Sequence, residues 1–103
     1  MEKKIRDFLD KYSRSIPWDN VPWNLCDESE PDLSEFPFLK YCHGRLLHCI
    51  LRDDMNIVVQ GTYCEYESGT KLWYDETGWC LYPKNWIELD TLINYLNSIQ
   101  FFD

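Results

Sequence analysis

The chain has 103 residues, of which 45% are hydrophobic and 17% are aromatic, and its formal net charge is −8. This length fits a single domain, and the aromatic content argues against disorder despite the charge. The acidic balance argues against direct binding to nucleic acid or to an anionic membrane, because both need clustered Lys and Arg, and it favours a basic protein partner.

The cysteines and the first residues indicate a compartment. The N-terminal residues lack the apolar region of a secretory signal, and no apolar run approaches the ~20 residues that span a bilayer. An odd number of cysteines without a C-x-x-C pair fits a reducing environment better than a disulfide framework. These are Cys26, Cys42, Cys49, Cys64 and Cys80. We therefore expect a cytoplasmic protein, in a bacterial or host-cell cytosol.

The first segment, residues 1–14, is predicted to hold an amphipathic helix over residues 2–13. Apolar side chains recur there at the helical spacing i, i+3, i+4, i+7, at Ile5, Phe8, Leu9 and Tyr12. The helix should end before Pro17, because the residue that precedes a proline avoids the helical conformation.

Residues 15–39, here called the acidic loop, contain no Lys or Arg and three prolines. A long irregular segment in a small domain is uncommon and is often functional. We expect Trp18 and Trp23 either to pin this loop to the body or to contact a partner. Its carboxylates are Asp19, Asp27, Glu28, Glu30, Asp32 and Glu35.

Residues 40–83 are predicted to form an antiparallel sheet. Residues 36–43 fit either an edge strand or a short helix that ends at Gly44. The predicted strands are 45–52, which is apolar on both faces and therefore central, 57–66 with a possible bulge at Gly61, 70–74 and 79–82. Asp53 and Asp54 lie in one predicted hairpin turn, and Asp75, Glu76 and Gly78 lie in another.

The last segment, residues 84–103, is predicted to be a helix with Leu89, Leu92, Ile93, Leu96 and Ile99 on one face. Asn85 with Glu88 fits a capping box, but we favour Asp90 as the N-cap, with residues 86–89 extended. The chain is therefore predicted to be one α+β domain of two layers, with three to five strands. Both helices should lie on one face, which leaves rings such as Trp73, Tyr74 and Trp79 on the other face uncovered.

Catalytic and metal-binding patterns are weak. Cys42-His43 and His48-Cys49 do not have zinc-ligand spacing, and adjacent residues of a strand point to opposite faces. No nucleophile, metalloprotease or phosphate-binding motif is present. We therefore expect no metal, no cofactor and no enzymatic activity.

The residues expected to bind a partner are acidic or aromatic: Asp27, Glu28, Glu30, Asp32, Glu35, Asp53, Asp54, Asp75, Glu76, Trp18, Trp23 and Trp79. Carboxylates along an extended segment can take the place of backbone phosphates in a basic groove, and aromatic rings supply desolvated anchors. The sequence favours an inhibitor of immunity or phage counter-defence type that blocks a nucleic-acid-handling protein. A small-ligand binder with an aromatic pocket, a homodimeric interaction domain and a merely hydrated acidic surface are the alternatives.

Overall fold

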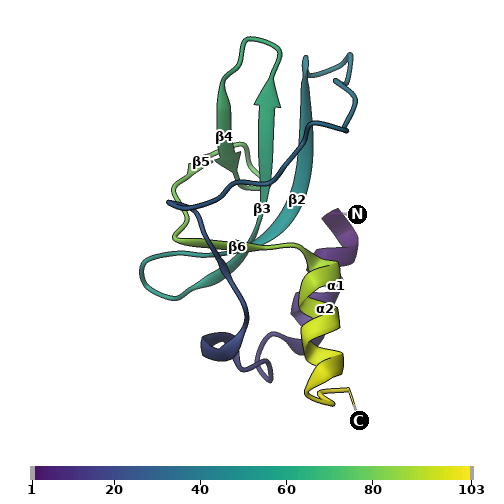
Figure 1. The fold of residues 1–103 in the computed structure, drawn as a ribbon, viewed down its shortest axis with the longest axis vertical. Helices are drawn as coiled ribbons and strands as arrows, with labels where there is room; N and C mark the ends of the chain where they lie inside the picture. Colours follow the sequence, from purple (N-terminus) through teal and green to yellow (C-terminus); the bar gives the residue numbers. More distant parts are fainter. Residues whose placement is uncertain (1, 103) are drawn as a thin grey trace.

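The computed structural model describes residues 2–102, so the predictions for Met1 and Asp103 lie outside the described residues. It contains two helices and a six-stranded antiparallel sheet, which confirms the α+β class (Figure 1). The elements are α1 (Glu2–Tyr12), η1 (Trp18–Asn20), β1 (Asn24–Leu25), β2 (Gly44–Arg52), β3 (Val58–Tyr66), β4 (Lys71–Tyr74), β5 (Cys80–Leu81), β6 (Asn85–Ile87) and α2 (Leu89–Ser98).

The strand count differs from the prediction because β1 and β6 are only two and three residues long. Strands this short carry no readable alternation of apolar and polar residues. Residues 36–43 form turns with one bridge between Leu39 and Gly44, rather than a full edge strand or a short helix. In the described part of the chain, neither helix has the length and apolar character needed to cross a membrane.

The strands are arranged in the order β1-β6-β2-β3-β4-β5. The central ladder pairs β2 with β3 over nine residues without interruption. The bulge predicted at Gly61 is absent, since Gly61 pairs in register with Cys49. A Cβ atom at Gly61 would overlap Cδ1 of the buried Leu51, so this glycine makes room for a core side chain.

Both helices pack against one face of the sheet, where they form the helix-side core (Figure 1). Ile5 of α1 and Leu92 and Leu96 of α2 are buried there with Ile50 and Ile87 of the sheet. Together with the partly buried rings around them, these residues shield the apolar faces of both amphipathic helices from water.

Helix α2 begins at Leu89, so neither predicted N-cap is used. Asn85 belongs to β6 and is buried, where its Oδ1 accepts a hydrogen bond from Arg52 at 3.1 Å. Asp90 lies in the first turn of the helix, where a carboxylate is favourable beside the helix dipole. The cap position is occupied by Glu88, which makes no side-chain cap bond.

The sheet curls so that its two ends approach each other. β5 and β6 lie four positions apart, which corresponds to about 19 Å in a flat sheet. The link of residues 82–84 allows only about 14 Å from Leu81 to Asn85. The curl encloses a second, concave core of Cys49, Leu51 and Trp86, with Trp73 and Leu81 packed against it.

The concave side is not the uncovered aromatic face that the sequence predicts. The chain between β1 and β2 crosses it (Figure 1), and Trp86 Nε1 donates a hydrogen bond to the carbonyl oxygen of Ser29 at 3.1 Å. Trp73 and Tyr74 are half-buried and point to opposite faces, as neighbours on a strand do. Of the three predicted rings, Trp79 is the one that is well exposed, at 74%.

Candidate functional site

The first part of the acidic loop is fixed to the body by its two tryptophans and one arginine. Trp18 and Trp23 are half-buried, and their Nε1 atoms donate to the carbonyl oxygens of Ser13 and Trp18, at 2.8 and 2.9 Å. The guanidinium of Arg52 lies 5.0 Å from the centre of the Trp23 ring and 3.4 Å from Asp19 Oδ1. These rings therefore anchor the loop.

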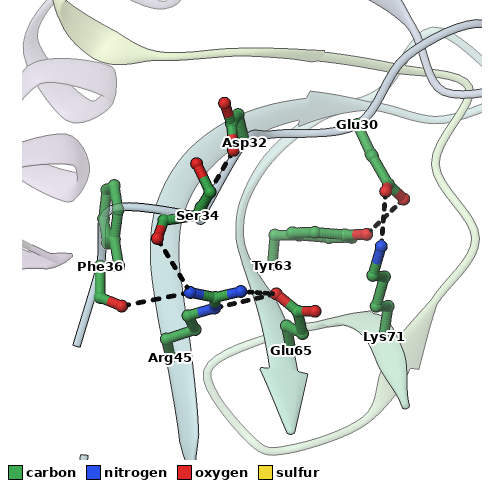
Figure 2. A network of polar contacts seen from close by, with 8 residues as sticks. All are labelled: Glu30, Asp32, Ser34, Phe36, Arg45, Tyr63, Glu65 and Lys71. Carbon is green, nitrogen blue, oxygen red and sulfur yellow. Dashed lines mark hydrogen bonds and ion pairs between the residues drawn. The ribbon is translucent and has the colours of Figure 1, made fainter. Parts of the chain in front are cut away.

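The middle of the acidic loop is fixed by Glu30 (Figure 2). Its carboxylate accepts hydrogen bonds from Lys71 Nζ at 2.8 Å and from the Tyr63 hydroxyl at 2.6 Å. The bond from Lys71, and then the bond from Tyr63, lower the pKa of Glu30 below its ordinary value. Burial, followed by the bond to Glu30, raises the pKa of Tyr63. Glu30 is thus engaged within the fold.

The far end of the acidic loop is held by Arg45 (Figure 2). Its guanidinium pairs with Glu65 at 2.8 Å and also donates to the carbonyl oxygens of Ser34 and Phe36, at 3.3 and 3.4 Å. Asp32 Oδ1 accepts a bond from the backbone N–H of Ser34, which is the main reason why its pKa is lowered. Asp32 therefore closes a turn of its own loop.

Most carboxylates at the hairpin tips also have structural roles. Asp53 accepts bonds from two backbone N–H groups of its own turn, and Asp75 does the same in the turn before β5. Glu76 forms an ion pair with Arg6 at 2.9 Å. Within residues 2–102, four predicted contact carboxylates have no hydrogen bond or ion pair: Asp27, Glu28, Glu35 and Asp54.

Three of these four carboxylates meet at one opening of the molecule, here called the seam cleft. It lies where the curled sheet brings β5 toward the turn that follows β1, and its volume is about 710 Å³. Asp27 and Glu28 come from that turn, and Asp54 comes from the β2–β3 hairpin. Trp73, Leu81 and Tyr82 also line the cleft. Glu35 and Trp79 lie elsewhere.

Tyr82, Lys71 and Lys84 also line the seam cleft, although they are not among the predicted contact residues. Tyr82 is 88% exposed. Its exposure is readable from alternation once Leu81 is assigned to the core, because neighbouring residues of a strand face opposite sides. The lysines carry no such local signal, since their position depends on the curl of the sheet.

The cysteines and histidines do not form a second centre. All five cysteines are free, and burial raises the pKa of the Cys26 thiol to about 11, with a further contribution from Asp27. His48 Nδ1 lies 2.7 Å from the Thr62 hydroxyl. Among residues 2–102, no group of three or more His, Cys, Asp or Glu side chains is placed to hold a metal ion.

No protein-family model, curated protein or solved structure matches this chain.

Proposed function

We propose that this protein is a small acidic inhibitor that binds a basic, nucleic-acid-handling protein and blocks its nucleic-acid groove. In this proposal it acts in the cytosol of a bacterium or of a host cell, as immunity proteins and phage counter-defence proteins do, and has no catalytic activity. The main support is the convergence of Asp27, Glu28 and Asp54, which have no partner within the described residues, at the lip of one open cleft.

The free carboxylates support binding to a basic partner for an electrostatic reason. A carboxylate that is already paired, such as Glu30 with Lys71, offers little to a partner because a new contact must replace an existing one. Asp27, Glu28 and Asp54 need no such exchange. Their charge would mainly raise the association rate, and the exposed ring of Tyr82 would mainly slow dissociation. The proposed contact surface is therefore the seam cleft rather than the whole acidic loop.

The proposal is tested by affinity capture from a host lysate, followed by kinetics on the captured protein. We expect a basic nucleic-acid-handling protein whose association slows steeply between about 0.05 and 0.5 M salt, as screened charges require. The partner's nucleic-acid binding should be lost when the complex forms. An association rate that does not depend on salt, or a partner that still binds nucleic acid in the complex, would contradict the proposal.

Charge reversal locates the contact surface. The variant Asp27→Lys/Glu28→Lys should weaken binding by about tenfold or more, because two ion pairs become two repulsions. The matched control is Asp7→Lys/Asp10→Lys on the exposed side of α1, which changes the net charge by the same amount. Equal losses of affinity in the two variants would mean that binding depends on the overall charge alone. That result would contradict the seam cleft as the contact surface.

A second candidate function is the binding of a small planar ligand in the seam cleft. Its volume of about 710 Å³ lies in the usual range for ligand sites, and Trp73 is part of its lining. Against an anionic ligand, Lys71 is already paired with Glu30, so Lys84 alone would oppose three carboxylates. A change in tryptophan fluorescence with one member of a nucleotide panel would favour this candidate, and a flat response would remove it.

A further inference from the structure

We infer that the partner enters the seam cleft as an extended segment bearing Lys or Arg, which adds to the outer edge of β5 as a β-strand. This inference rests on the proposed function and specifies its contact. Three observations carry it: the open edge of β5, the composition of the two walls of the cleft, and the charge of the wall that faces β5.

The outer edge of β5 offers free backbone groups. β5 is the last strand in the sheet order, so within residues 2–102 only β4 pairs with it. The N–H of Asp75 donates to the carbonyl oxygen of Trp79 at 2.9 Å, and hydrogen-bonded and non-bonded pairs alternate along an antiparallel ladder. Leu81 therefore directs its N–H and C=O toward β4, whereas Cys80 and Tyr82 direct theirs away from the sheet.

The two walls of the seam cleft differ in what they present. They meet where the N–H of Cys26 donates to the carbonyl oxygen of Lys84 at 3.0 Å. In the turn after β1, the N–H groups of Glu28 and Ser29 are already bonded to the carbonyl oxygen of Leu25. The wall formed by β5 thus offers backbone donors and acceptors, and the wall formed by the turn after β1 offers carboxylate side chains.

An extended basic segment satisfies both walls together. Its backbone pairs with Cys80 and Tyr82, and every second side chain turns into the cleft. A Lys or Arg at those positions lays its apolar stem along Leu81 and Trp73 and reaches Asp27 or Glu28 with its charged end. The edge is short and stops at Pro83, which limits pairing to a few residues and favours a specific contact over aggregation.

A second copy of this chain is a poorer occupant of the same edge. Pairing β5 with β5 would bring two seam clefts together, each with Asp27, Glu28 and Asp54 at its lip. Like charges placed face to face oppose association. Charge complementarity therefore selects a basic segment from another protein.

The test uses synthetic peptides and the intact protein. The probe is an eight-residue peptide of alternating Lys and Val. One matched peptide replaces Lys by Glu, and another carries a methyl group on every backbone nitrogen, which keeps the side chains but blocks strand pairing. We expect the Lys-Val peptide to protect the amide protons of Cys80 and Tyr82 from exchange. Both matched peptides should bind with an affinity that is lower by about tenfold or more.

Protein variants check the same contact from the other side. Cys80→Pro removes an outward N–H that the fold does not use, and Cys80→Ser keeps it. We expect the Cys80→Pro variant alone to lose affinity for the Lys-Val peptide. Amide exchange in the unaltered protein decides the matter if Cys80→Pro does not fold.

Several results would overturn the inference. These are equal binding of the methylated peptide, no binding of the Lys-Val peptide, and amides of Cys80 and Tyr82 that stay unprotected in the complex. If the amides stay unprotected while the captured partner is still lost on Asp27→Lys/Glu28→Lys, strand addition is wrong and the proposed function stands. Protection that rises with protein concentration in the absence of peptide would assign the edge to a second copy.

Discussion

Glu28 and Glu30 are two residues apart in the sequence but have opposite roles. The carboxylate of Glu30 receives bonds from Lys71 and Tyr63, whereas the carboxylate of Glu28, which lines the seam cleft, has no bonded partner among the described residues. The difference arises because side chains from strands β3 and β4 reach one of them. A carboxylate engaged in this way lowers the energy of the folded state, and a free one remains available to a partner.

The role of Glu30 predicts a specific dependence on pH. Its lowered pKa means that it stabilises the fold above its ordinary value of 4.5, and that this stability is lost as the pH falls through the folded-state pKa. We expect Glu30→Gln to flatten the fall in unfolding free energy below about pH 5. Asp32 and Asp75, whose pKa values are also lowered, should retain part of the slope.

Denaturant titrations at a series of pH values measure this slope. The control is Glu35→Gln, because Glu35 is exposed and makes no bond within residues 2–102. The control should keep the slope of the unaltered protein. If Glu30→Gln kept the same slope as well, the ion pair with Lys71 would not contribute to stability.

Among the elements of the fold, the acidic loop joins the two faces of the sheet: Ile16 and Val21 at its start belong to the helix-side core, and its part after β1 covers the concave side. It is held at one end by Arg52, in the middle by Lys71 and at the far end by Arg45. The three basic side chains come from β2 and β4, so the sheet neutralises part of the loop that crosses it. Within residues 2–102, the loop carboxylates that remain free are Glu35 and the pair Asp27 and Glu28, which lie in a turn between the first two attachments.

The attachment by Arg45 can be weakened without removing its charge. In Arg45→Lys, the ammonium group can still pair with Glu65, but it has no planar fork to reach the carbonyl oxygens of Ser34 and Phe36 as well. We expect the amide of Phe36 to exchange faster and the global stability to fall by about 1 kcal/mol. Amide exchange followed by NMR measures both effects.

The control for this variant is Lys40→Arg, at an exposed position with no bonded partner in the described part of the chain. It should leave the Phe36 amide unchanged. Unchanged exchange in Arg45→Lys would show that Arg45 does not hold the loop.

At the scale of the whole molecule, the two cores share one strand. Ile50 of β2 belongs to the helix-side core, and its neighbours Cys49 and Leu51 belong to the concave core. Because the three residues are consecutive in β2, loss of one core removes the support of the other. The fold should therefore behave as one cooperative unit.

This cooperativity is tested with Leu92→Ala, which opens a cavity in the helix-side core alone. We expect a loss of about 2–5 kcal/mol, with the same midpoint in far-UV circular dichroism and in tryptophan fluorescence. Trp79→Ala, at an exposed site, should change stability by no more than about 0.5 kcal/mol. Two separate midpoints would show that the concave core survives alone.

Features that depend on neighbouring residues can be predicted from the amino-acid sequence alone. The spacing of Ile5, Phe8 and Leu9 predicts α1, the apolar run of β2 predicts a central strand, and Gly78 adopts the positive φ, 89°, that its turn requires. The charge and exposure of Asp27, Glu28 and Asp54, which line the seam cleft, follow from their positions in loops, whereas none of the predicted contact rings Trp18, Trp23 and Trp79 lines it.

Which carboxylates are free, and where the cleft lies, depend on contacts between segments that are distant in the sequence. Glu30 meets Tyr63 and Lys71 across 33 and 41 residues of sequence, and the indole of Trp86 meets Ser29 across 57. The seam cleft exists because a three-residue link joins strands four positions apart and forces the sheet to curl. Local patterns carry no information about such pairings, because each depends on where distant segments pack after the chain has folded.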